Sequence, residues 1–294
     1  MMGLARRRAA GFCGPSIRAA LLGLLLATPF AGAQAQFKYD VPYVPTPPVV
    51  VEEMLRLAAV RADDFVLDLG SGDGRVVIAA ATKLGASGIG VELDADLILE
   101  SEDNAALAGV GDRVSFRRED LFKFDLARAT VITLYLVPTI NMKLRPRLLN
   151  ELKPGTRIVS HDFDFGDWKP DARSTVRKNV FLWIVPAKIG GRWRVDLERT
   201  EGIRSYEVEL TQNYQEIDGL VRYGGKEVAL WNPGLRGDAV RFTVVDDSAG
   251  VDTNLYFEGR VDGGRMEGGV LRGVGVGQQQ MRWQATRVDA EGKK

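Results

Sequence analysis

The feature that most constrains the fold is a short apolar stretch that runs directly into a glycine-rich turn. Residues 65–69 are apolar apart from Asp68 and are followed by a turn containing three glycines, after which residues 75–84 are mostly apolar. A strand, a glycine turn and a helix in this order leave bare backbone N–H groups at the carboxyl end of a strand. Small polar ligands bind at such an edge. The predicted ligand-binding turn comprises Gly70, Ser71, Gly72, Asp73 and Gly74.

The same alternation continues along the first half of the chain. Short apolar runs alternate with helical patterns, which predicts βαβ units, right-handed crossovers and a mainly parallel sheet. A further helix is expected from Pro48, because the proline-rich residues 43–48 must lie extended before it. The predicted strands are 65–69, 88–91, 114–116, 131–136 and 157–161, and the predicted helices are 75–84 and 97–107.

Beyond Pro170 the helical patterns stop. Residues 180–185 and 193–197, joined across two glycines, predict a hairpin that closes the edge of the same sheet. From about Ser205 apolar and polar residues alternate, which predicts antiparallel strands with one solvated face. Turn signals divide this region into six or seven strands, forming a small barrel or a curved sheet. Its expected core includes Trp231, Tyr256, Phe257 and Trp283.

The first 35 residues have the pattern of an export signal. Four arginines precede an apolar run over residues 19–30, and Ala33-Gln34-Ala35 then supplies a small-x-small cleavage site. The run is shorter than the roughly 20 residues that span a bilayer, so no permanent membrane anchor is expected. We therefore predict a periplasmic or secreted protein. A mitochondrial-type presequence is the alternative, because no acidic residue precedes Asp40.

This signal also bears on the composition of the exported chain. Cys13 is the only cysteine, so cleavage after Ala35 excludes disulfides, thiol catalysis and cysteine-bound metals. Loss of the four arginines leaves 35 basic against 39 acidic residues. Such a balance gives no basic footprint for nucleic acid. The predicted organisation is a signal at 1–35, an α/β domain at 36–200 and a smaller antiparallel β domain at 201–294.

Two cofactors compete for the glycine turn. A dinucleotide fingerprint G-x-G-x-x-G requires a glycine where this chain has Arg75. The carboxylate of Asp68 would repel a pyrophosphate but attract the ammonium and sulfonium charges of S-adenosylmethionine (SAM). SAM is therefore the predicted cofactor.

Two further acids follow the next strands in the order that SAM requires. Glu92, 24 positions after Asp68, suits the two ribose hydroxyls, and Asp120 with the N–H of Leu121 suits the adenine ring. The alternative for Glu92 and Asp120 is an ordinary exposed acid in a loop.

Together these motifs resemble the class I SAM-dependent methyltransferases. Within them the chain is similar to the mitochondrial protein-lysine methyltransferases that act on the ATP synthase c subunit and the adenine nucleotide translocase. The resemblance covers about residues 42–170. It is carried by Tyr43–Pro47, Asp68–Ala80 (DLGSGDGRVVIAA), Gly90–Leu93, Asp120–Lys123 and a closing stretch from Glu151 that contains F-x-F-x-x-W-x-P at 163–170.

The resemblance implies a Rossmann-like sheet with helices on both faces, SAM as cofactor and a protein lysine as methyl acceptor. The chain departs from that group in its export signal and in the β domain after residue 200. The mitochondrial substrates are therefore not carried over.

The acceptor is expected where the fourth and fifth strands end, next to the methyl group. Tyr135 lies at the position of an acceptor-binding loop, although the Asn-Pro-Pro-Tyr sequence used for adenine or glutamine amides is absent. His161, the only histidine, is a candidate base or orienter of the acceptor. The alternatives are a core aromatic residue and a structural histidine. His161, Asp162 and Asp164 follow one another in one short strand and so point to alternate faces, and no metal site is expected.

The extended N-terminal segment offers two more candidates. Tyr43 and Thr46 precede the first helix and are predicted to form a lid over the cofactor, mere surface packing being the alternative. The leading hypothesis is N-methylation of a protein lysine, with an acceptor at a membrane surface as one option. Methylation of a small molecule, or a non-catalytic module that binds a partner, are the alternatives. The intact Asp68, Gly70, Gly72, Gly74 and Glu92 set favours activity.

Overall fold

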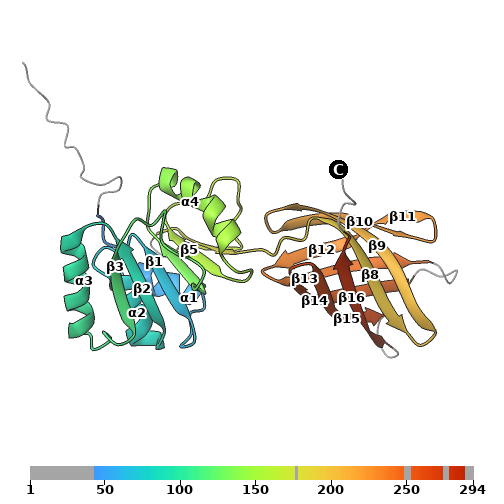
Figure 1. The fold of residues 1–294 in the computed structure, drawn as a ribbon, viewed down its shortest axis with the longest axis horizontal. Helices are drawn as coiled ribbons and strands as arrows, with labels where there is room; N and C mark the ends of the chain where they lie inside the picture. Colours follow the sequence, from blue (N-terminus) through green and yellow to red (C-terminus); the bar gives the residue numbers. More distant parts are fainter. Residues whose placement is uncertain (1–42, 176–177, 248–252, 274–277, 289–294) are drawn as a thin grey trace, which may run out of the picture. The chain divides into compact units, whose positions relative to one another are not determined.

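The computed structural model describes residues 43–175, 178–247, 253–273 and 278–288. The predicted export signal lies outside them. The described chain forms two sheets, one mixed with seven strands and one antiparallel with nine (Figure 1). Within the described residues, no helix is both long and apolar enough to cross a membrane.

The first sheet has the strand order β3-β2-β1-β4-β5-β7-β6. β1 to β5 are parallel to one another, and β7 runs antiparallel to both β5 and β6. The order reverses between β1 and β4, and ligands bind at the carboxyl ends of strands at such a point. The strands are β1 Phe65–Leu69, β2 Ser87–Glu92, β3 Val114–Arg118, β4 Val131–Leu134, β5 Arg157–His161, β6 Ala172–Ser174 and β7 Val180–Ile184.

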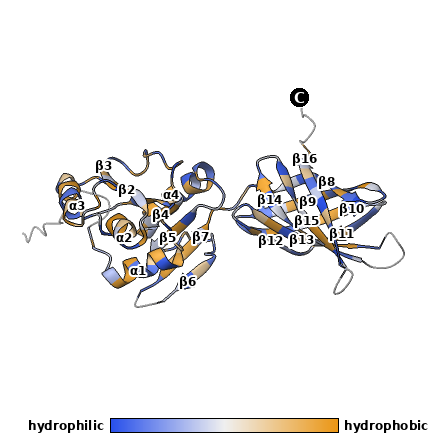
Figure 2. Ribbon diagram, turned by 90° about the horizontal axis from the view of Figure 1, so that it is seen from below, coloured by the Kyte–Doolittle hydropathy of each residue, from blue (hydrophilic) through white to orange (hydrophobic). Residues whose placement is uncertain are grey.

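Helices cover both faces of this sheet, as predicted. Val66 of β1 packs with α1 and α2 on one face, and Leu67, the next residue, packs with α4 on the other. Figure 2 shows α1 and α2 on one side of the strands and α4 on the other. The side chains alternate in this way because successive residues of a strand point to opposite faces. The helices are α1 Pro48–Leu57, α2 Arg75–Leu84, α3 Ala95–Leu107 and α4 Pro138–Glu151.

Most predicted elements of this region are confirmed, but helix α4 was missed. Its buried face carries Ile140, Leu144 and Leu148 at four-residue spacing, which is typical of a helix. The interior Pro146, which disfavours a helix in isolation, hides this pattern. Packing of the apolar stripe against the sheet outweighs that local cost.

The predicted hairpin at the edge of the first sheet is wrong. β7 does belong to that sheet, but the following strand β8 pairs with β9 and β16 of the second sheet. The burial patterns explain the separation. All five residues of β7 are buried, whereas β8 buries alternate residues, as a strand with one solvated face does. The second sheet therefore begins at Gly191 rather than at residue 201.

The second sheet has nine strands, not six or seven. All neighbours are antiparallel, in the order β11-β10-β9-β8-β16-β15-β14-β13-β12. The strands are β8 Gly191–Arg199, β9 Gly202–Asn213, β10 Glu216–Tyr223, β11 Lys226–Ala229, β12 Trp231–Arg236, β13 Ala239–Asp246, β14 Thr253–Asp262, β15 Arg265–Arg272 and β16 Gln279–Arg287.

Aromatic residues fill part of the core of this sheet. Phe257 and Trp283 are buried as predicted, whereas Tyr256 is only half-buried. The indole of Trp283 lies where a side chain at Gly259 would be, and its Nε1–H donates to the backbone oxygen of Glu258 at 3.0 Å. Trp231 is 66% exposed, so its predicted place in the core is wrong.

Candidate functional site

The turn between β1 and α2 depends on glycine at three positions. Gly70, Gly72 and Gly74 have φ angles of +80°, +54° and +77°, a region that L side chains rarely adopt. A Cβ atom at Gly72 would lie 2.4 Å from the ring of Tyr43, and one at Gly74 would lie 2.6 Å from the ring of Phe116. Backbone conformation and close packing therefore both require the bare turn predicted from the sequence.

Asp68 lies at the end of β1, just before this turn, and is only 4% exposed. The hydroxyl of Thr133 on β4 donates to its Oδ1 at 2.6 Å. Burial raises the pKa of the Asp68 carboxyl to about 7, and the charges of Glu92 and Asp73 add to the rise. A cationic ligand would relieve this cost, whereas a pyrophosphate would increase it. The buried carboxylate of Asp68 therefore fits the positively charged SAM.

Glu92 lies at the end of β2 beside the turn. Its carboxylate accepts backbone N–H bonds from Gly72 at 3.1 Å, Leu93 at 2.7 Å and Asp94 at 3.1 Å. A carboxylate has about four acceptor positions, so one remains for a hydroxyl. The structure thus brings Glu92 to the turn in a fixed orientation that suits the ribose.

The residues predicted at the adenine lie next to Glu92 but have structural contacts of their own. The backbone N–H of Glu119 donates to the backbone oxygen of Glu92 at 3.1 Å. The carboxylate of Asp120 accepts from the N–H of Phe122 at 2.9 Å. Leu121 packs partly buried against the core beneath α4. The structure therefore places the segment after β3 beside the ribose acid, and Asp120 also stabilises its own turn.

Two side chains of the turn point into the protein. Asp73 forms an ion pair with Arg75, whose Nε and Nη2 lie 2.8 Å and 2.5 Å from the two carboxylate oxygens. The Oγ atom of Ser71 is buried without a hydrogen-bond partner in the described chain, and a Cβ atom at Gly90 would lie 2.6 Å from it. The turn therefore offers a ligand mainly its backbone, because the side chains of Ser71 and Asp73 point away from it.

The N-terminal segment reaches both the cofactor turn and the end of β5. The ring of Tyr43 covers Gly72, and Thr46, which is 5% exposed, lies with its Oγ1 3.2 Å from Nδ1 of His161. Arg75 donates from Nη1 to the backbone oxygen of Thr46 at 2.9 Å. The segment thus has the position that a lid requires. Arg75 was missed as a site residue, because its contact with Thr46 has no local sequence signal.

The ends of β4 and β5 bring together the two predicted acceptor residues. The rings of Tyr135 and His161 have centroids 3.9 Å apart, and Phe163 stacks on Tyr135 at 6.2 Å. His161 is 1% exposed, and its Nε2 is buried 3.6 Å from a carboxylate oxygen of Asp162. Burial lowers the pKa of His161, which keeps the ring neutral at pH 7. Both ring nitrogens face protein groups, so the geometry suits an orienting residue better than a base exposed to substrate.

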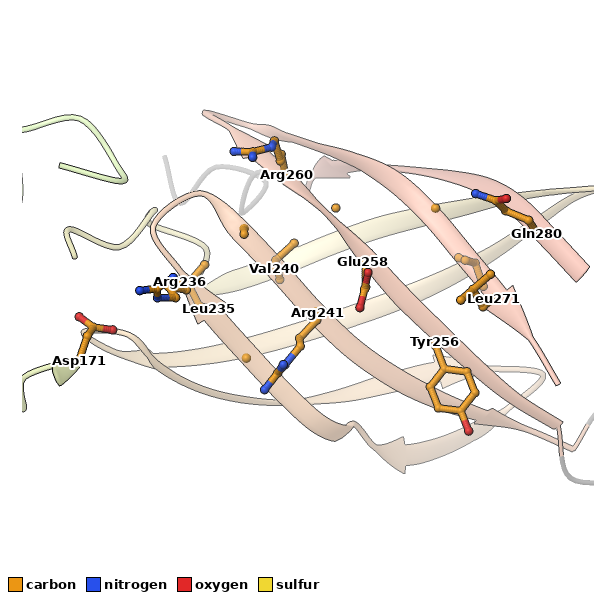
Figure 3. Close-up of a pocket in the computed structure, with 15 residues that line it drawn as sticks. Asp171, Leu235, Arg236, Val240, Arg241, Tyr256, Glu258, Arg260, Leu271 and Gln280 are labelled. Carbon is orange, nitrogen blue, oxygen red and sulfur yellow. The ribbon is translucent and has the colours of Figure 1, made fainter. Parts of the chain in front are cut away.

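No group of three or more potential metal ligands occurs within the described residues. A pocket of about 840 Å³ lies on the second sheet, lined mainly by residues of β12 to β16 (Figure 3). It contains apolar residues such as Leu235 and Leu271, together with Arg241 and Glu258, which are opposite each other on β13 and β14. None of the residues predicted to bind the cofactor or the acceptor lines it.

The fold and the site together define a class I SAM-dependent methyltransferase. The seven-stranded sheet, its antiparallel β7, the glycine turn after β1 and the acid at the end of β2 are all in place. Residues 68–172 match the ANTKMT methyltransferase domain family. The chain belongs to this methyltransferase family, and SAM is its cofactor.

Relatives with assigned activities agree with this assignment. A protein-lysine N-methyltransferase of Saccharolobus islandicus (strain REY15A) is 46% identical over 49% of this chain and 94% of its own length. Two lysine N-methyltransferases of the ATP synthase c subunit, from Xenopus laevis and Mus musculus, are 37% and 38% identical over 50% of this chain. The chain spans 63% and 58% of these two proteins.

A solved structure shares a similar region. The RNA methyltransferase from Salinibacter ruber, in complex with S-adenosyl-L-homocysteine, is 52% identical and covers 50% of this chain and 96% of its own, with a TM-score of 0.49.

Proposed function

We propose that this enzyme transfers the methyl group of SAM to the Nε atom of a lysine in a protein substrate. The observation that carries the proposal is the 46% identity to a protein-lysine N-methyltransferase over almost the whole of that relative. The acceptor side supports it, because Tyr135 and Phe163 are both partly exposed where β4 and β5 end. Aromatic faces attract an ammonium group and pack against the alkyl chain of a lysine.

The chemistry asks little more of the protein than placement. A lysine ammonium, with an ordinary pKa of about 10.4, must first lose a proton to water. The amine lone pair then forms the N–CH₃ bond while the S–CH₃ bond breaks, leaving S-adenosylhomocysteine. A desolvated aromatic surrounding lowers the pKa of the amine and holds it in line with the sulfonium.

The proposal extends to the location of the enzyme. The arginines, apolar run and small-x-small site of residues 1–35 support export from the cytoplasm. Outside the cytoplasm, membrane-associated proteins are available as acceptors. Fractionation of cells that express the untagged chain tests this part. We expect the mature protein in the periplasmic or secreted fraction, beginning near Gln36. A full-length chain in the cytoplasm would contradict it.

The acceptor is tested directly with radiolabelled SAM. The purified protein is incubated with protein extract, with RNA and with small-molecule extract from cells lacking its gene. Products are analysed by mass spectrometry, and the Asp68→Asn variant serves as the inactive control. We expect label on lysine residues of one or a few proteins. Transfer to RNA or to small molecules alone would refute the lysine proposal and leave the methyltransferase assignment intact.

A further inference from the structure

One arginine joins the cofactor turn to the acceptor side of the site. Arg75 binds the carboxylate of Asp73 through Nε and Nη2, and its Nη1 donates to the backbone oxygen of Thr46. The hydroxyl of the same Thr46 contacts Nδ1 of His161, which is 115 positions away in the sequence. The path from the glycine turn to the end of β5 thus consists of an ion pair and two hydrogen bonds.

The other end of the N-terminal segment contacts the same arginine. The ring of Tyr43 packs on Gly72, and its hydroxyl interacts with both Asp73 and Arg75. Burial and the charge of Asp73 together raise the pKa of Tyr43. Arg75 therefore holds the segment at both of its ends.

The position of Arg75 is not explained by the stability of its helix. Arg75 is the first residue of α2, which has no acidic residue in its first turn. A cation there opposes the helix dipole and is mildly destabilising. An arginine at this position therefore contributes through its contacts with Asp73 and Thr46.

Few polar contacts orient the buried imidazole of His161. Its Nε2 has no hydrogen-bond partner in the described structure, so the contact with Thr46 and the tilted ring contact with Tyr135 orient the ring. Besides burial, the charge of Asp162 raises its pKa and the charge of Lys178 lowers it. A shift of Thr46 would therefore release both His161 and the ring of Tyr135.

We propose that Arg75 is a positioning residue for methyl transfer, which holds segment 43–47 closed over the cofactor turn and thereby fixes the rings of His161 and Tyr135 at the acceptor side. This role requires the SAM site but not any particular acceptor. Its failure is thus distinct from failure of the lysine proposal.

The test uses the full chain without a histidine tag, because His161 is then its only histidine. Two measurements are made: the Kd for SAM by isothermal titration, and the ¹⁵N NMR signals of the imidazole, which report its tautomer and pKa. In Arg75→Lys, the ammonium keeps the ion pair with Asp73 but cannot also reach Thr46. We expect SAM to bind about tenfold more weakly, as for loss of a hydrogen bond from a charged donor, and the His161 signals to shift or broaden.

Thr46→Val separates the two effects. It removes the hydroxyl but keeps the backbone oxygen that Arg75 binds, so the His161 signals should change while the Kd for SAM changes less than in Arg75→Lys. Adding Thr46→Val to Arg75→Lys should change neither measurement further. The matched control, Arg265→Lys on the exposed face of β15, should leave both as in the wild type.

Two results would overturn the proposal. If Arg75→Lys leaves the His161 signals unchanged, the arginine does not reach the acceptor side, whatever happens to SAM binding. If Arg75→Lys and Thr46→Val have additive effects on the Kd and on the His161 signals, the two residues do not act through one path and the arginine has only a structural role.

Discussion

The two sheets bury a carboxylate to the same extent but satisfy it differently. Asp68 and Asp246 are each 4% exposed. Asp68 accepts one hydrogen bond in the described structure, from Thr133, and its pKa is raised to about 7. Asp246 accepts from two arginines and a tyrosine, namely Arg199, Arg204 and Tyr206.

This difference separates a binding site from a structural network. A buried acid with too few partners is costly until a cation arrives, so it marks a place where a ligand completes the structure. A buried acid surrounded by cationic donors is already complete and contributes to fold stability through its partners. In the second sheet, burial and the charge of Asp246 also raise the pKa of Tyr206 to about 12, so its hydroxyl remains a donor.

The largest expected effect comes from breaking the satisfied network. Asp246→Ala leaves Arg199 and Arg204 without their buried partner, which should lower the free energy of unfolding by about 3 to 5 kcal/mol. Chemical denaturation followed by tryptophan fluorescence measures this change. The Kd for SAM should stay at the wild-type value. Parallel loss of SAM binding would show that the two sheets are coupled and that the comparison fails.

The next effect concerns the unsatisfied acid. Asp68→Asn keeps an acceptor for Thr133 but removes the charge, so SAM should bind about a hundredfold more weakly, within the range for a lost charged interaction. The ligand-free variant should also unfold at a temperature a few degrees higher, because the cost of burying the charge is gone.

Isothermal titration and thermal denaturation check both parts. Asp63→Asn, a change to an exposed acid just before β1, is the matched control and should alter neither. Equal SAM affinity in the wild type and Asp68→Asn would contradict the cofactor site itself.

The affinity for SAM should change by at most about tenfold per pH unit. Because the pKa of Asp68 is raised to about 7, the free protein holds a proton that SAM must displace. Affinity should therefore fall as pH decreases below 7 and level off above about pH 8. The ionised Asp68 also costs the ligand-free protein stability. The free energy of unfolding should therefore fall as the pH rises from the ordinary pKa of a carboxyl group to about 7.

Titrations between pH 6 and 8, in two buffers of different ionisation enthalpy, measure the released proton. The Asp68→Asn variant should show no such release. Affinity that rises as the pH falls would have the wrong sign and would exclude Asp68 as the titrating group.

The smallest effect is expected at Trp231. With its side chain 66% exposed, replacement by serine should change the free energy of unfolding by no more than about 0.5 kcal/mol. Chemical denaturation measures it under the same conditions as for Asp246→Ala. A loss of more than about 2 kcal/mol would mean that this tryptophan belongs to a buried contact after all.

Much of the first sheet was predictable because its signals are local. The apolar run 65–69, the turn glycines and the helix 75–84 lie within 20 consecutive residues, and the structure confirms all three. Asp68 and Glu92 could be predicted as cofactor-binding acids from their places at strand ends, and the structure brings both to the turn. Helix α4 also carries a local signal, because Ile140, Leu144 and Leu148 are spaced four residues apart, although Pro146 interrupts the pattern.

Other features depend on partners that are distant in the sequence. β7 and β8 are consecutive, yet they pair in different sheets. The different burial patterns of the two strands became visible only in the folded structure. The exposure of Trp231 could not be read from its residue type, because an aromatic side chain on a strand fits either face.

The sequence by itself determined a glycine turn that only a left-handed backbone can form, the order of strands and helices around it, and the acids predicted to favour a cationic cofactor. These follow from interactions between near neighbours. The tertiary structure decided the high pKa of Asp68, the link from Arg75 through Thr46 to His161, and the sheet to which β8 belongs. Burial, and contacts across more than a hundred residues, exist only once the chain has folded.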